Sequence, residues 1–399
     1  MSINKPPSSY QTQSQGLPEP DQDSLVHSQH TLTAIKAMIQ SAQGKISFQQ
    51  FMQAALFEPG LGYYRCGTEK FGQLGDFITA PEVSPFFGQC LANVIAQTSV
   101  GREVLEVGAG SGQLAISMLN GLNDKGILPD TYYILELSSE LRERQQRNIH
   151  AALPELVDRV IWLDDLPKSF KGVVVANELL DAMPVKRFKL DNNEVFEEFV
   201  VWKNDKLAYT YVPASDPRLL ARVEELKQTT TISEVTPYYS EVNFIAEDWI
   251  RSLASSIDSG VVLIVDYGYP RSSYYHAQRS MGTLMCHYQH RAHSDPLILP
   301  GIQDITAHID FTAMADAAIE GGMEVVGFAS QAHFLLNTGI LSLIDPQQQE
   351  LPDFLQASGE IKRLTLPGEM GESFKVMAFT KNYEGDVTGF EQHDIRHLL

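Results

Sequence analysis

The chain has 399 residues, 43% of them apolar, and 30 basic against 50 acidic side chains give a formal net charge of -20. This length can bury a large core, in one domain with insertions or in two domains. The negative charge repels a nucleic-acid backbone over most of the surface and attracts a basic protein substrate. The same charge is also typical of a protein that only needs to stay soluble, so it does not define a partner.

The N-terminus and the cysteines indicate where the protein works. Residues 1–29 are rich in Ser, Gln, Pro and Asp, without the apolar core of a secretory signal or the arginines of a transit peptide, so we expect them to be disordered. Cys66, Cys90 and Cys286 are widely spaced, which indicates neither a disulfide framework nor a thiolate zinc site. No apolar run approaches the length of a membrane span. These features predict a cytoplasmic bacterial enzyme that has no membrane or nucleic-acid partner.

Residues 30–100 are predicted to form a helical cap with a long loop. Apolar residues at helical spacing predict helices from His30 to about Gln40 and from Ser47 to Leu56, with Ser47 as the N-cap of the second. The glycine-rich segment Phe71–Glu82 is predicted to be a loop and not a helix, and loops of this type often hold ligands. Another helix is expected from Ser84 to about Thr98.

The segment Val104–Gly112 is the most informative part of the chain. Its first four residues read as a buried parallel strand, and the alternating glycines Gly108, Gly110 and Gly112 then form a turn before a helical pattern that starts at Gln113. Glycines let the backbone approach a ligand closely, and the first N–H groups of the helix face that ligand. The pattern predicts a nucleotide-binding turn, and the alternative is an ordinary α/β turn without a ligand.

Two acids narrow the choice of nucleotide. A dinucleotide fingerprint needs glycine where the chain has Gln113, which disfavours a pyrophosphate and a nicotinamide oxidoreductase. Glu106 beside the turn would repel phosphate but attract a cation, and S-adenosyl-L-methionine carries an ammonium and a sulfonium. Glu136 follows the next strand at the position expected to take ribose hydroxyls. The sequence therefore predicts S-adenosyl-L-methionine as the cofactor.

Strands and helices alternate through most of the rest of the chain. This alternation predicts an α/β, Rossmann-like fold with a parallel sheet and right-handed crossovers. Between about Val185 and Val212, short alternating runs broken by Asp191–Asn193 and Asn204–Asp205 predict an inserted antiparallel β-meander. The expected organisation is a disordered start (1–29), a helical cap (30–100), a donor-binding half (101–184), a substrate-side insertion with the meander (185–245), the remainder of the domain (246–383) and a tail (384–399).

Ligands of open α/β sheets bind at the carboxyl ends of the strands, so the residues that end each strand are candidates for the site. Asp164 or Asp165 is positioned to accept a hydrogen bond from an adenine amino group, or else lies in a solvated turn. The segment Ala176–Val185 is the most specific of these ends. Asn177 and Glu178 follow four buried residues there, and Asp266 ends a later strand.

Glu178 and Asp181 are three residues apart, which places both carboxylates on one side if a helix starts there. Paired carboxylates suit a guanidinium, whose fixed fork of donors matches two oxygens. Methyl transfer is a direct displacement, so such a pair would orient an arginine and hold charge on its unreactive nitrogen. The alternative is an acidic pair that only complements a helix dipole.

Four histidines raise the question of a metal. His287, His290 and His293 recur every third residue, with His276 nearby. Three imidazoles would share one face only if the segment were helical, and no carboxylate or cysteine pattern completes a ligand set. We therefore predict no metal site.

Several segments together resemble the MidA family of class I S-adenosyl-L-methionine-dependent methyltransferases, which includes a mitochondrial complex I assembly factor that methylates a protein arginine. The resemblance implies a seven-stranded sheet, a donor site at Glu106–Gly112 and Glu136, and a protein arginine acceptor. It also implies that Asp76 and Thr79, together with Asn177–Asp181 and Asp266–Gly268, line the site. The matching segments are Gly75–Ser84, Leu105–Gly112, Ala176–Val185, Asp266–Gly268, Asp304–Phe311 and Gly368–Val376.

Two functional hypotheses follow. In the first, the chain is an enzyme in which Asp76, Thr79, Asn177 and the residues of the glycine turn bind the donor, and Glu178, Asp181 and Asp266 act in catalysis. In the second, the fold serves as a binding module for assembly, with little or no catalysis. The sequence leaves open the acceptor protein, the methylation pattern and the oligomeric state, a homodimer included.

Overall fold

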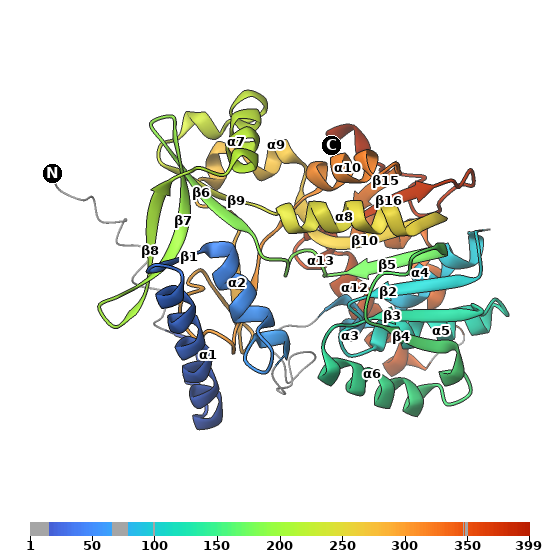
Figure 1. Cartoon of the computed structure of the whole chain (residues 1–399). Coiled ribbons are helices and arrows are strands. Elements are labelled where there is room, and N and C mark those ends of the chain that lie inside the picture. The colour runs from blue at the N-terminus through green and yellow to red at the C-terminus, as the bar shows by residue number, and fades with distance from the viewer. Residues whose placement is uncertain (1–15, 66–78, 99, 346, 348–349) are drawn as a thin grey trace. The chain divides into compact units, whose positions relative to one another are not determined.

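The computed structural model describes residues 16–65, 79–98, 100–345, 347 and 350–399 (Figure 1). The described residues form two compact units, each built from separate parts of the chain. Unit 1 combines residues 16–65, Asp181–Ile245 and Arg271–His308, and unit 2 combines residues 79–180, Ala246–Pro270 and Ile309–Leu399. Among the helices in these ranges, none is both long and apolar enough to cross a bilayer.

Unit 2 is built on a large mixed sheet whose path is β15-β16-β10-β5-β2-β3-β4, with β14 paired to β10 beside it. Strands β4, β3, β2, β5 and β10 are parallel to one another, and β16 is antiparallel to both β10 and β15. This confirms the predicted α/β fold with a seven-strand path. The strands are β2 (Glu103–Val107), β3 (Thr131–Leu135), β4 (Val160–Leu163), β5 (Phe170–Asn177), β10 (Ile257–Tyr269), β14 (Ile309–Asp310), β15 (Glu324–Ser330) and β16 (Phe374–Lys381).

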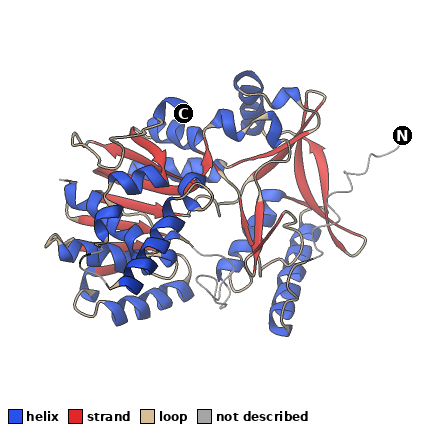
Figure 2. Cartoon of the chain, turned by 180° about the vertical axis from the view of Figure 1, so that it is seen from behind, coloured by secondary structure: helices blue, strands red, loops and turns tan. Residues whose placement is uncertain are grey.

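Helices cover this sheet, as Figure 2 shows for the red strands and the surrounding blue helices. Parallel strands that are covered by helices need near-continuous apolar sequence, and Val173–Ala176 of β5 are all at most 2% exposed. The helices of unit 2 are α3 (Ala80–Val83), α4 (Pro85–Gln97), α5 (Gln113–Asp124), α6 (Ser139–Ala152), most of α8 (Phe244–Ser256), α10 (Phe311–Glu320), α11 (Gln331–Asn337), α12 (Leu351–Thr365) and α13 (Met370–Ser373).

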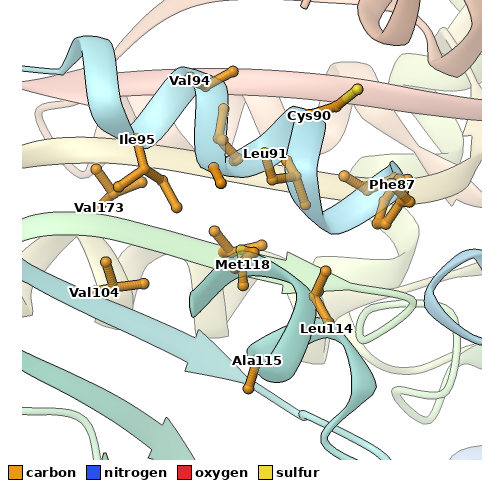
Figure 3. Close-up of a cluster of buried hydrophobic side chains, with 14 of the residues drawn as sticks. Phe87, Cys90, Leu91, Val94, Ile95, Val104, Leu114, Ala115, Met118 and Val173 are labelled. Atoms are coloured by element: carbon orange, nitrogen blue, oxygen red, sulfur yellow. The ribbon is translucent and has the colours of Figure 1, made fainter. Parts of the chain in front are cut away.

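Helices α4 and α5 pack together against one face of the sheet (Figure 3). Phe87, Leu91 and Val94 of α4 and Met118 of α5 belong to one buried hydrophobic cluster, and all four side chains are at most 1% exposed. Two glycines allow the close approach. A Cβ on Gly88 would lie 2.2 Å from the Ser117 hydroxyl oxygen, and one on Gly121 would lie 2.9 Å from the Ala92 Cβ. The start of α5 is thereby fixed beside the strand that carries the glycine turn.

Unit 1 contains the predicted antiparallel meander. The two expected breaks are hairpin turns, because Asn192, Asn193, Asn204 and Asp205 all have positive φ angles, between 48° and 71°. The strands of its larger sheet are β1 (Lys45–Ser47), β6 (Lys186–Asp191), β7 (Glu194–Lys203), β8 (Lys206–Pro213) and β9 (Tyr238–Val242). Its helices are α1 (Gln22–Ser41), α2 (Phe48–Phe57), α7 (Pro217–Thr229) and α9 (Arg271–Tyr274).

Two local predictions were wrong. Helix α1 begins at Gln22, inside the segment expected to be disordered, and Asp21 is its N-cap. The first buried residues of this helix are the polar Ser28 and Thr31, so its N-terminal half shows no apolar residues at helical spacing. The end of the Phe71–Glu82 loop also contains a helix, since Ala80–Val83 forms the single turn α3 with a proline in its first positions.

The division of the chain also differs from the expected one. Residues Arg271–His308 belong to unit 1, although they were assigned to the remainder of the donor-binding domain. They contain a small antiparallel sheet of β11 (Met285–Tyr288), β12 (Arg291–His293) and β13 (Asp304–Thr306). Cys286 and Ile305 of that sheet share a buried cluster with Phe48 and Phe51 of α2. Tertiary packing of this kind leaves no local signal in the sequence.

Candidate functional site

The predicted glycine turn follows β2 in unit 2. Gly108, Gly110 and Gly112 have φ angles of 75°, 53° and 88°, in the left-handed region where a side chain is strained. The Gly108 N–H donates to the Leu135 carbonyl at 3.0 Å, and a Cβ on Gly108 would lie 3.0 Å from Leu179 Cδ1. The path of the backbone therefore needs glycine. Because glycine has no side chain, the backbone of the turn stays accessible to a ligand at the carboxyl ends of the central strands.

Glu106 lies on β2 just before the turn and is 1% exposed. The Tyr132 hydroxyl donates to its carboxylate at 2.5 Å. Burial raises the pKa of Glu106 to about 7, against the lowering effect of the Tyr132 hydrogen bond. Only part of the population is therefore charged at neutral pH, so the expected attraction between this acid and a cation is weaker than for an exposed carboxylate.

Glu136 follows β3 directly and is 8% exposed. One carboxylate oxygen accepts from the Ser138 N–H at 2.8 Å, and the other accepts from the Gln145 side-chain amide at 3.0 Å. Burial raises the pKa of Glu136, while these two donors oppose the increase. A carboxylate offers about four lone-pair positions, so Glu136 can still accept from two more donors, as the predicted ribose hydroxyls require.

Asp164 and Asp165 lie after β4 and are exposed. The Arg142 guanidinium donates to Asp164 at 2.7 Å, and it also donates to the carbonyls of Glu136 at 3.0 Å and Leu163 at 2.9 Å. Arg142 thus joins the ends of β3 and β4. The predicted adenine contact of Asp164 or Asp165 stays a prediction.

Asn177 and Glu178 lie where β5 ends. Among the described residues, the buried Oδ1 of Asn177 has no hydrogen-bond partner, while its Nδ2 donates to the Glu178 carboxylate at 3.1 Å. Glu178 has a φ of 49°, which is uncommon for a residue with a side chain, and its N–H donates to the Val265 carbonyl at 2.8 Å. A strained acid beside an unpartnered buried acceptor is typical of a ligand-binding site.

Asp266 lies within β10 and is 0% exposed. One carboxylate oxygen accepts from the Leu180 N–H at 3.0 Å, and the other accepts from the Tyr267 N–H at 2.9 Å. The bond from Leu180 holds the segment after Glu178 against β10. The geometry favours a positioning role for Asp266 over direct contact with reacting atoms.

Asp181 does not follow Glu178 on a helix, as the sequence suggested. The residues between β5 and β6 form bends and a turn, because the left-handed Glu178 stops a helix from starting there. Asp181 is 5% exposed and belongs to unit 1, where its carbonyl accepts from the Ala307 N–H at 3.0 Å. Burial raises the pKa of Tyr64 in that unit, and the charges of Asp304 and Asp181 raise it further.

The resemblance implied two site residues in the loop before α3, and the structure describes only one of them. Asp76 lies outside the described residues. Thr79 is half-buried and stands at the N-cap of α3, without a capping bond from its side chain. In the same helix, the Glu82 carboxylate accepts from the Ser111 hydroxyl of the glycine turn. Glu82 is therefore a neighbour of the turn that the sequence did not single out.

Helix α6 supplies two more residues that sequence reasoning missed. Gln145 donates to the Gly110 carbonyl at 3.1 Å, and Asn148 donates to the Ser111 carbonyl at 2.9 Å. A signal was present, because Gln145 lies between Leu141 and Ile149 on the buried face of the helix. A glutamine in an apolar stripe needs hydrogen-bond partners, which points to a polar site beneath it.

The four histidines do not lie on one helix. His287 is in β11 and His293 is in β12, which are antiparallel neighbours in unit 1. Burial lowers the pKa of both imidazoles, so they are neutral at physiological pH. Across the described ranges, no group of three His, Cys, Asp or Glu side chains could hold a metal ion.

The residues of unit 2 fit a nucleoside with a cationic tail. The glycine turn leaves the backbone accessible, Glu136 retains lone pairs for ribose hydroxyls, and the unpartnered Asn177 Oδ1 can accept from an ammonium. These groups follow three neighbouring strands, β2, β3 and β5, at the same edge of the sheet. This arrangement matches S-adenosyl-L-methionine better than a pyrophosphate, which an acid would repel.

Comparisons with known proteins agree with this reading. A family model described as "Putative S-adenosyl-L-methionine-dependent methyltransferase" matches residues 87–329. A crystal structure of a protein from Burkholderia thailandensis bound to S-adenosyl-homocysteine is 40% identical, with a TM-score of 0.91 over 96% of this chain and 100% of that one. A second crystal structure from the same organism is 39% identical, with a TM-score of 0.88 and the same coverage.

Curated relatives are more distant. The mouse mitochondrial protein arginine methyltransferase NDUFAF7 is 28% identical over 84% of this chain and 81% of its own length. The zebrafish protein of the same name is 29% identical over 84% of this chain and 83% of its own length. With the family match and the close structural relative, the chain belongs to the family of S-adenosyl-L-methionine-dependent methyltransferases, and S-adenosyl-L-methionine is its cofactor.

Proposed function

We propose that this chain methylates an arginine side chain of a protein substrate. The observation that carries the proposal is Glu178, a half-buried carboxylate held in a left-handed conformation at the carboxyl end of β5. Relatives that match more than four-fifths of this chain are named protein arginine methyltransferases, which supports the same acceptor here. The net charge of -20 favours a basic protein surface as the partner.

The chemistry explains why an acid is needed. When bound, S-adenosyl-L-methionine supplies a methyl group on a sulfonium, and the sulfur keeps the electron pair of the broken bond. A guanidinium nitrogen is a poor nucleophile, because its lone pair is delocalised and its pKa is above about 12. Glu178 holds the positive charge on the nitrogen that does not react, so that the attacking nitrogen keeps electron density. The proton that the methylated nitrogen loses passes to solvent or to a carboxylate.

The other predicted residues have separate tasks in this proposal. Glu136 and the glycine turn bind the nucleoside, and Asn177 accepts from the donor's ammonium. Asp266 keeps the Leu180 segment in place by accepting a hydrogen bond from the Leu180 N–H. Asp181 is given no task in this proposal, because the helix that was expected to place it on the same side as Glu178 does not form.

The test compares Glu178→Gln with Glu143→Gln, which changes an exposed acid on α6. Each protein is incubated with donor carrying a labelled methyl group and with a cell lysate, and the labelled protein is hydrolysed to identify the modified amino acid. We expect labelled methylarginine with the natural chain and the control. Glu178→Gln should lower the rate about 100-fold, while its affinity for S-adenosyl-homocysteine stays within about threefold.

Other outcomes separate the remaining hypotheses. Label on a different amino acid, or on a small molecule, would contradict the arginine acceptor and leave the methyltransferase assignment intact. No label in any protein, together with tight donor binding, would favour the binding module. In that case Glu178→Gln would leave the association with the partner protein unchanged.

A further inference from the structure

Gln145 occupies an unusual position in α6. The helix buries Leu141, Gln145 and Ile149 at a spacing of four residues, so the glutamine takes a place that would normally be apolar. Its side chain is 0% exposed. A fully buried amide without partners would be strongly destabilising, so its hydrogen bonds must justify its presence there.

The three hydrogen bonds of the Gln145 amide connect three strands. The nitrogen Nε2 donates to the Gly110 carbonyl after β2 at 3.1 Å and to the Glu136 carboxylate after β3 at 3.0 Å. The oxygen Oε1 accepts from the indole N–H of Trp162 in β4 at 2.9 Å. Because an indole N–H can only donate, the amide has a single orientation that satisfies all its neighbours.

The glycine turn also packs directly on this residue. The position of a Cβ on Gly112 would be 3.5 Å from the Gln145 Cα. Since the Gly110 carbonyl points to α6, the N–H of the same planar peptide, on Ser111, points the opposite way. Gln145 thus fixes both the direction of this peptide and the position of the Glu136 carboxylate.

We infer that Gln145 is a positioning residue for the methyl donor, which it reaches only through Glu136 and the Gly110 peptide. Gln145 donates to one lone pair of the Glu136 carboxylate and so orients it, and the remaining lone pairs of that carboxylate then meet the ribose hydroxyls. Gln145 also couples the Gly110 peptide to the Glu136 carboxylate, because its Nε2 donates to both. Trp162 supports this role by fixing the amide orientation. The inference rests on the donor and not on the identity of the acceptor.

The test is Gln145→Met, which keeps the length of the side chain but removes the donors. Its matched control is Gln146→Met, the same substitution at the next residue, which is exposed. Calorimetry measures the affinity for S-adenosyl-homocysteine and for its 2′-deoxyribose analogue. We expect Gln145→Met to bind S-adenosyl-homocysteine about tenfold more weakly, and the control to match the natural chain.

The ratio of the two affinities separates positioning from packing. The natural chain should prefer the intact ribose about tenfold, and Gln145→Met should lose most of that preference, because Glu136 is no longer oriented. A merely structural role would weaken both ligands equally and leave the ratio unchanged, which would overturn the inference. A natural chain that shows no preference would overturn it as well.

A second variant guards against misfolding. Trp162→Phe keeps an aromatic ring in β4 but removes the N–H that fixes the amide of Gln145. We expect Trp162→Phe to reduce the ribose preference less than Gln145→Met does, because Gln145 still donates to both of its acceptors. Circular dichroism confirms folding of each variant. An unchanged preference in folded Trp162→Phe and in folded Gln145→Met contradicts the proposed network.

Discussion

At the scale of the residue, burial changes what each predicted acid can do. Glu106 and Asp266 are at most 1% exposed, and each is already engaged, by the Tyr132 hydroxyl and by two backbone N–H groups respectively. Glu136 and Glu178 lie at strand ends, where a ligand can reach the carboxyl edge of the sheet. The acids of the site therefore divide into those that support the backbone and those that can meet a ligand.

Glu106 provides a prediction about pH and stability. Its pKa of about 7 in the folded chain exceeds its ordinary value of 4.5, so the folded state binds more protons between these two pH values. The free energy of unfolding therefore falls as the pH rises through this range. Glu106→Gln cannot ionise and still accepts from Tyr132. Its stability relative to the natural chain should rise by up to about 3 kcal/mol between pH 5 and pH 8.

Urea unfolding of both proteins at the two pH values measures this difference, and other titrating groups cancel in the comparison. The matched control is Gln146→Met on the exposed face of α6, which changes no titratable group, so its stability relative to the natural chain should not change with pH. A constant difference for Glu106→Gln would mean that Glu106 remains charged throughout, and that the attraction to a cation expected from the sequence is intact.

At the scale of the element, the glycine turn is the part that sequence reasoning identified most completely. Gly110 has a φ of 53°, and Gly126, on the loop after α5, has a φ of 68° with no atom within 4 Å of a Cβ position. Gly110→Val and Gly126→Val should therefore cost a similar backbone strain, about 1–2 kcal/mol. Only Gly110→Val should abolish binding of S-adenosyl-homocysteine, because only that side chain would enter the donor site.

Thermal unfolding and calorimetry on the same samples check this pair of variants. Similar losses of stability with a selective loss of binding support the turn as the donor site. If Gly110→Val binds normally, the donor lies elsewhere and the glycines are needed only for the path of the chain. If Gly126→Val also loses binding, the effect comes from general destabilisation.

Local patterns explain which elements could be predicted. The Ser47 cap, the hairpin residues Asn192 and Asn204, and the apolar strand Val173–Ala176 each carry their structure in their own sequence. Contacts between distant segments do not. No residue near Gln145 in the sequence indicates that Glu136 and Trp162 are its hydrogen-bond partners. The position of Gln145 on an apolar helix face indicates only that it needs partners.

At the scale of the whole molecule, the chain crosses between the two units five times. The sequence indicated the donor-binding half and the meander, because each has its own periodicity. It did not assign Arg271–His308 to unit 1, because that assignment depends on packing against α2, more than two hundred residues earlier. The predicted site residues likewise fall in both units, with Asp181 in unit 1 and Glu178 in unit 2.

This division predicts where donor binding stabilises the molecule. A ligand at 100 times its dissociation constant stabilises the folded state by about 2.7 kcal/mol, and openings that release the ligand become correspondingly rarer. We expect S-adenosyl-homocysteine to slow hydrogen exchange most at the ends of β2, β3 and β5 and at the start of α6. Amides in the β7 and β8 hairpin of unit 1 should be slowed less.

Hydrogen exchange followed by mass spectrometry, with and without the ligand, measures this pattern, and Gly110→Val serves as the control in which the ligand has no effect. Equal slowing across both units would show that the chain opens as one cooperative body. Slowing confined to unit 1 would contradict the placement of the donor site altogether. The predicted pattern follows from the site residues alone, since Glu136, Asn177 and the glycine turn all belong to unit 2.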